Sequence, residues 1–160
     1  MWKFASPLLL IPGLLGVIWS SAVSQDNRLE SIQIPNVPHI QQKPDFCGEA
    51  CVAMALNRLG RNVDQDWVFD HAGLDPHLGR GCYTRDLAKA VKAIGFDPGP
   101  IWYTVAANRS RSELDSQFRQ LHRDLKRGVP SIVCMHYNDR PNTTEHFRLI
   151  VGYSQSDDEV

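Results

Sequence analysis

The pattern of apolar and polar positions divides the chain into helices first and strands later. Residues 47–59 are almost entirely apolar and rich in helix formers, and they stop at Gly60, so they predict a helix that is buried on every face. A second helix is expected over residues 64–71, with Asp64 as its N-cap. A third is expected over residues 85–94, capped by Thr84.

The second half of the chain adds one amphipathic helix and a set of strands. The helix precedes Gly128, and its apolar stripe consists of Leu114, Phe118, Leu121 and Leu125. Residues 100–105 read as a strand, and residues 129–137 and 146–153 read as the two strands of an antiparallel hairpin. Helices followed by an antiparallel sheet predict an α+β fold.

The N-terminus has the outline of a signal peptide. Residues 1–24 contain Lys3, then an apolar run, then the small residues Ala22-Val23-Ser24. The run is interrupted by Pro12 and is shorter than the roughly 20 residues that span a membrane. We expect cleavage after Ser24 and an exported domain over residues 25–160; an uncleaved N-terminal anchor is the alternative.

Charge and cysteine content narrow the range of partners. With 17 basic and 18 acidic residues the chain is almost neutral, which gives no reason to expect nucleic acid, so a peptide or protein partner is predicted. Stable membrane insertion is not expected once the signal peptide is removed. The four cysteines are few for a disulfide framework, although Cys51 and Cys82 could form one bridge.

Cys47 is the sharpest candidate for chemistry, because an extended segment turns into a helix at this residue. The start of a helix carries unpaired N–H groups and a partial positive charge, which favour a nucleophilic thiolate. A glutamine a few residues upstream, Gln41 or Gln42, could hold an oxyanion together with the N–H of the cysteine. A structural or disulfide-bonded cysteine is the alternative for Cys47.

His146 is the candidate base. It opens an otherwise apolar strand, and a rigid strand end can hold an imidazole against a thiol. Taken alone, a histidine at a strand edge is more simply a solvated or hydrogen-bonded residue. The case for His146 rests on its pairing with Cys47.

Three segments resemble the bacteriocin-processing, double-glycine cysteine peptidases and their secreted relatives of the papain-like superfamily. They are residues 37–42, 47–56 and 146–153. The resemblance implies a papain-like fold, with a central buried helix carrying the cysteine on an antiparallel sheet carrying the histidine. It further implies Cys47 as nucleophile, His146 as general base and acid, and Gln42 as oxyanion donor, with Gln41 as the alternative. No cofactor and no metal are implied.

The same resemblance implies an Asp or Asn on the strand after that of His146, to orient the imidazole. Asp157 and Asp158 are the available acids, and they read as turn residues. We therefore expect the orienting residue to be absent and the domain to be cut short at its C-terminus.

Other readings stay open. Cys47, Cys51, His136 and His146 supply enough ligands for a zinc site, although structural zinc ligands usually lie on turns. The main hypothesis is an exported thiol hydrolase that cleaves peptide bonds. A cell-wall peptide amidase or transpeptidase of similar fold is one alternative, and a non-catalytic peptide-binding domain that lacks the orienting acid is another.

Overall fold

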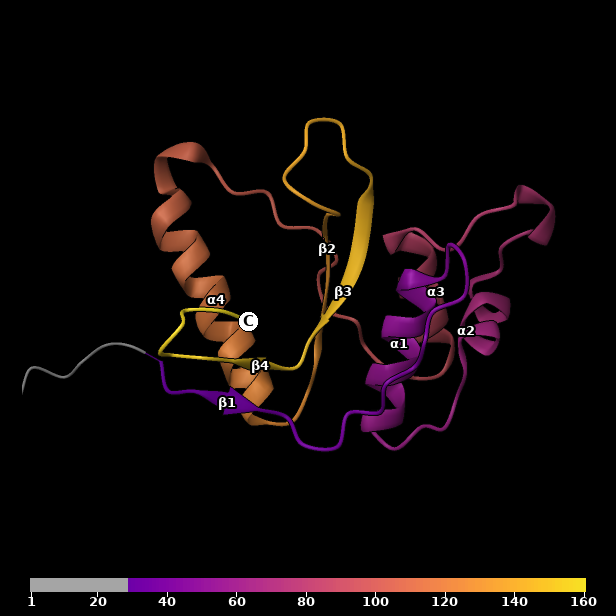
Figure 1. Cartoon of the computed structure of the whole chain (residues 1–160), viewed down its shortest axis with the longest axis horizontal. Coiled ribbons are helices and arrows are strands. Elements are labelled where there is room, and N and C mark those ends of the chain that lie inside the picture. The colour runs from indigo at the N-terminus through magenta and orange to yellow at the C-terminus, as the bar shows by residue number, and fades with distance from the viewer. Residues whose placement is uncertain (1–28) are drawn as a thin grey trace, which may run out of the picture.

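The fold was analysed in a computed structural model, which describes residues 29–160. The expected signal peptide and its cleavage site lie outside these residues. Figure 1 shows a group of helices on one side, a single long helix on the other and a hairpin between them. Within the described residues, none of the helices combines the length and apolar character needed to cross a membrane.

The first body consists of three helices that the sequence predicts. They are α1 (Cys47–Arg58), α2 (Gln65–Ala72) and α3 (Thr84–Ala93). The carboxylate of Asp64 caps α2 by accepting a hydrogen bond from the Trp67 N–H at 2.8 Å. The expected cap of α3 is wrong by one residue: Tyr83 is the N-cap, and its N–H donates to the Asp86 carboxylate at 3.0 Å.

The second body centres on α4 (Ser110–Lys126), which follows a short 3-10 turn, Ala107–Arg109. Another 3-10 turn, Pro76–Leu78, lies between α2 and α3. Most of the expected apolar stripe of α4 faces a core, and Leu125 is only 1% exposed. Leu114 does not belong to it, because its side chain is 54% exposed.

The strands within residues 29–160 form two small antiparallel sheets, so the α+β class is confirmed. β2 (Ser131–His136) pairs with β3 (Glu145–Ile150) as the expected hairpin. The chain then changes partner, because β4 (Gly152–Tyr153) pairs with β1 (Ile32–Gln33) near the N-terminal end of the described chain. The strand expected over residues 146–153 is therefore divided between two sheets.

The expected strand over residues 100–105 is not present. This segment is a loop in which Trp102 and Tyr103 are 68% and 60% exposed. A strand needs a neighbour that completes its backbone hydrogen bonds, and both sheets formed within residues 29–160 leave this segment out. Its aromatic and branched residues indicated a strand, but β-propensity reflects packing on a partner that this segment lacks.

Each body has its own core, and the hairpin contributes to both. Phe147 and Leu149 pack with α1 and its neighbours in the first core, whereas Ile150 packs with Leu125 of α4 in the second. This division follows from the strand geometry, in which successive side chains point to opposite faces. The β2–β3 hairpin thus joins the two bodies, with one face against each.

Candidate active site

Cys47 is the first residue of α1, and a tight turn brings the chain to it. The Phe46 N–H donates to the Lys43 carbonyl at 3.0 Å, with Pro44 at the second position of the turn and Asp45 at a positive φ of 63°. Pro at the second position and a positive φ at the third are features of a type II turn. As the first helical residue, Cys47 has an N–H with no acceptor inside α1.

The segment before this turn is held by a side chain of α2. The buried amide of Gln65 accepts a hydrogen bond from the Lys43 N–H at 2.9 Å and donates one to the Gln41 carbonyl at 3.0 Å. Gln42 lies between these two anchors with its own side chain exposed. The backbone on both sides of Gln42 is therefore fixed while its amide is free.

Two glycines allow the start of α1 to pack closely against its neighbours. A Cβ on Gly48 would lie 2.6 Å from the Leu87 side chain and 3.0 Å from the ring of Phe147. A Cβ on Gly81 would lie 1.9 Å from the carbonyl oxygen of Asp45. The start of α1 is therefore enclosed by β3 on one side and by the loop before α3 on another.

His146 lies in β3, one residue before the ring that contacts Gly48. α1 and β3 lie side by side and begin at the same end of the pair (Figure 1). Phe147 faces α1, so strand alternation puts His146 on the other face, where its ring meets the ring of Tyr137 edge-on at 5.3 Å. The backbone of β3 thus brings His146 to the start of α1, but within residues 29–160 no hydrogen bond joins its ring to Cys47.

The comparisons with known proteins bear directly on this arrangement. The model of the Peptidase_C39 like family matches residues 34–160, which include the turn, α1 and the hairpin. The chain belongs to this family. Membership points to a cysteine peptidase, as the Cys47 and His146 segments led us to expect. Comparison with the curated proteins and with the solved structures gave no match.

Asp157 and Asp158, the two acids considered as the orienting residue, both form hydrogen bonds within a turn. The carboxylate of Asp157 accepts a hydrogen bond from the Ser154 hydroxyl at 2.6 Å, and that of Asp158 accepts one from the Tyr153 hydroxyl at 3.1 Å. Asp158 has a positive φ of 53°, which is common for Asp in turns. This agrees with the turn expected there, and among residues 29–160 no carboxylate hydrogen-bonds to His146.

The four cysteines are all unbridged, so the Cys51–Cys82 bridge that the sequence left open is not formed in this structure. Both thiols are buried in the first core. Burial, and after it the negative charges of Cys47 and Glu49, raises the pKa of Cys51 to about 12. Burial also raises the pKa of Cys82, followed by the charge of Glu49. These two thiols stay protonated near neutral pH.

Cys134 is the exposed cysteine, and it lies on β2 opposite Phe147. Its thiol contacts the Glu145 carboxylate at 3.7 Å. Partial burial and then the negative charge of Glu145 raise the pKa of Cys134. The zinc reading is not supported, because the described residues contain no group of three or more His, Cys, Asp and Glu side chains that could hold a metal.

Glu49 is a site residue whose importance sequence reasoning missed. It is fully buried at 0% exposure, in the first turn of α1, and its Oε1 accepts a hydrogen bond from the Cys82 N–H at 2.7 Å. This bond ties the loop that carries Gly81 to the start of α1. The available signal was an acid in the first turn of an otherwise apolar helix.

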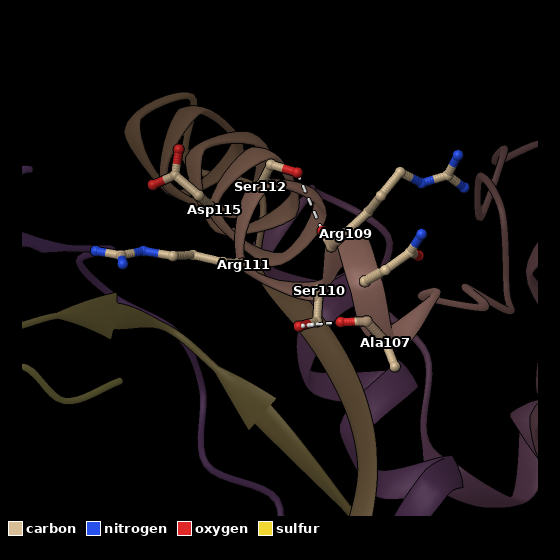
Figure 2. A pocket seen from close by; sticks show the side chains of 7 residues that line it. Ala107, Arg109, Ser110, Arg111, Ser112 and Asp115 are labelled. Atoms are coloured by element: carbon tan, nitrogen blue, oxygen red, sulfur yellow. Dashed lines mark hydrogen bonds between the residues drawn. The ribbon is translucent and has the colours of Figure 1, made fainter.

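The surface hollow at the start of α4 lies apart from these residues. It measures about 670 Å³ and is lined by residues 107–112 and Asp115. Figure 2 shows that its hydroxyls serve the local backbone: Ser110 donates to the Ala107 carbonyl and Ser112 to the Arg109 carbonyl. The hollow therefore has the features of an ordinary helix start, and it contains no residue of the candidate active site.

Proposed function

We propose that this chain is an exported thiol hydrolase that cleaves peptide bonds with Cys47 as nucleophile and His146 as base. The observation that carries the proposal is the position of Cys47 as first residue of a buried helix that begins beside β3. Unpaired N–H groups and a partial positive charge at a helix start are the environment in which nucleophilic cysteines are commonly found. Family membership supports the same activity and the papain-like fold.

The reaction follows from the chemistry of these groups. The Cys47 thiolate attacks the peptide carbonyl carbon, and the oxygen that becomes negative is held by the Cys47 N–H and the Gln42 amide. The imidazolium of His146 gives its proton to the leaving amine as the C–N bond breaks. Water, deprotonated by His146, then attacks the thioester and releases the carboxylic acid with the free thiol.

Gln42 is preferred to Gln41 as oxyanion donor on the basis of alternation. Lys43 forms an ion pair with Asp66, so its side chain points toward α2. In an extended segment Gln41 shares that side, and Gln42 takes the opposite one. The amide of Gln42 is thus directed away from Asp66, and its exposure leaves it available to a substrate.

His146 has to turn toward Cys47 for this chemistry. Its ring rests against Tyr137, which is 54% exposed, and the preceding Glu145 is also exposed. His146 is paired with Met135 in the hairpin and lies on the face of β3 away from α1, so bringing its ring to Cys47 also requires a local shift of the backbone at the start of β3. Catalytic hydrogen bonds that are long or misaligned without substrate commonly tighten when it binds.

Competition between cysteines for iodoacetamide at pH 6 tests the dyad, with the labelled residue identified by mass spectrometry. Exposure favours Cys134, whose pKa is raised by burial and Glu145, whereas a thiolate–imidazolium pair favours Cys47. We expect Cys47 to label first and His146→Ala to slow this labelling at least tenfold, whereas His77→Ala, at an exposed histidine between α2 and α3, leaves it unchanged.

Preferential labelling of Cys134, or no effect of His146→Ala, would contradict the dyad and favour a non-catalytic binding domain. Turnover is then measured with Cys47→Ser as the inactive control. Release of amine from short peptides supports a peptidase. Activity on cell-wall peptides alone would favour the amidase or transpeptidase alternative.

A further inference from the structure

We infer that Gln65 is a positioning residue that orients the oxyanion-binding side chain of Gln42; this inference rests on the proposed function. Gln65 is the first residue of α2 and is only 7% exposed. A buried amide must satisfy both its donor and its acceptor. Gln65 does so with the backbone groups on either side of Gln42, at 2.9 Å and 3.0 Å.

This pair of bonds reproduces what a neighbouring strand would provide. In an extended chain the carbonyl before a residue and the N–H after it point to the same side. One primary amide offers the matching donor and acceptor, so Gln65 aligns the backbone of Gln42 without a second strand. A glutamate in its place could accept from Lys43 but could not donate to the Gln41 carbonyl.

The two hydrogen bonds of Gln65 to the backbone on either side of Gln42, which we call the clamp, are continuous with the turn that leads to Cys47. Lys43, whose N–H is held by Gln65, uses its carbonyl to accept from Phe46 and so closes the turn at 3.0 Å. The two proposed oxyanion donors, the amide of Gln42 and the N–H of Cys47, therefore belong to one backbone unit anchored at a single side chain. A donor that is misplaced by about 1 Å can slow a reaction about a hundredfold.

The neighbouring ion pair offers a matched control. Lys43 and Asp66 lie on the surface next to the clamp, with side chains that are 51% and 54% exposed. Asp66→Asn removes this pair and leaves both hydrogen bonds of Gln65. An exposed pair contributes little to stability, so this variant should behave like the wild type.

Two reactions of Cys47 distinguish a misplaced oxyanion donor from a general loss of Cys47 reactivity. Acylation by N-acetylglycine p-nitrophenyl ester passes through an oxyanion, whereas alkylation by iodoacetamide does not. We expect Gln65→Glu to slow acylation about 10- to 100-fold and to leave alkylation within about twofold of the wild type. Asp66→Asn should change neither rate, and Gln65→Glu should cause no further loss of acylation in a Gln42→Ala background.

Gln65→Met, which keeps the shape of the side chain without its hydrogen bonds, replaces Gln65→Glu if the charge prevents folding. An equal fall in both rates, an unchanged acylation rate, or an additive loss in the Gln42→Ala background would overturn the positioning role. If wild-type Cys47 is neither acylated nor preferentially alkylated, the proposed function itself fails. If Gln42→Ala slows acylation and the Gln65 variants do not, only the positioning role fails.

Discussion

The cysteine side and the histidine side of the candidate site are built in different ways. Cys47 follows a turn anchored by Gln65 and starts a helix enclosed by two close glycine contacts. His146 lies beside the exposed tip of a hairpin, and its ring contact is with a surface tyrosine. The chain thus fixes the nucleophile by folding and places the base near the exposed end of the hairpin, on the face of β3 away from α1.

The largest effect is expected where the cysteine side is most tightly closed. Gly81→Ala would put a Cβ 1.9 Å from the Asp45 carbonyl, and both groups belong to the backbone, so the loop has to move. Overpacking of this kind costs about 3 kcal/mol or more. Urea unfolding should show this loss in the free energy of unfolding.

Gly79→Ala is the matched control in the same loop. Gly79 has a positive φ of 61° and open space around it, so alanine there costs only backbone strain of about 1 kcal/mol. Equal losses for the two variants would mean that the loop is not held against Asp45. The proposed rigidity of the cysteine side would then be wrong.

A smaller effect is expected where α1 meets α3. Gly48→Ala would press a Cβ against Leu87 at 2.6 Å, but the contact is the end of a flexible side chain, so we expect a loss of about 1–2 kcal/mol. Leu87→Val removes the contacting methyl group. In a double-mutant cycle the pair should cost less than the sum of the single changes; strict additivity would show that the two residues do not meet.

The sequence predicted the cysteine side better than the histidine side, for a physical reason. Helix α1 is encoded locally, by an apolar run and a glycine stop, and the structure confirms it; the Pro44-Asp45 turn before it is also local in sequence. The facing direction of His146 depends on how β3 is shared between two cores. Gln65 gave no local signal, because its partners lie 22 and 24 residues away in the sequence.

The hairpin itself was predicted, but the end of its second strand was not. An apolar run indicates that a strand is buried, and it carries no information on which partner each residue takes. The change of partner after Ile150 depends on β1, which joins β4 from the other end of the described chain. The strand predicted at residues 100–105 was wrong for the same reason. The segment has high β-propensity, but no strand within residues 29–160 pairs with it.

Alkaline pH should distinguish the buried cysteine of α1 from the exposed one of the hairpin. The pKa of Cys51 is raised to about 12 in the folded chain from an ordinary value of 9.0. The unfolded chain therefore loses its proton first, and stability falls as pH rises from about 9 toward 12. Since Cys51 is not completely shielded from solvent, we expect its contribution to the loss between pH 8 and pH 10 to be roughly 0.5–1 kcal/mol.

Urea unfolding at these two pH values, compared between variants, checks this contribution. Cys51→Ala should reduce the fall in the free energy of unfolding, whereas Cys134→Ala should change it much less because Cys134 is exposed. The same pH dependence in both variants would show that burial in α1 does not set the titration. In that case the buried Cys51 of α1 and the exposed Cys134 of the hairpin would not differ in their contribution to the pH dependence.

The smallest effect on stability is expected at Tyr137. This residue also gives the most direct test of whether the histidine side is less fixed than the cysteine side. Its ring meets the half-buried ring of His146 edge-on, and Tyr137 itself is 54% exposed, so Tyr137→Leu should change the free energy of unfolding by no more than about 0.5 kcal/mol. Without that ring His146 turns toward Cys47 more readily, and alkylation of Cys47 by iodoacetamide at pH 6 should become severalfold faster. Tyr103→Leu, at a similarly exposed tyrosine outside the hairpin, should leave the rate unchanged. An unchanged or slower rate in Tyr137→Leu would mean that the tyrosine does not hold the imidazole back, and the histidine side would then be as fixed as the cysteine side.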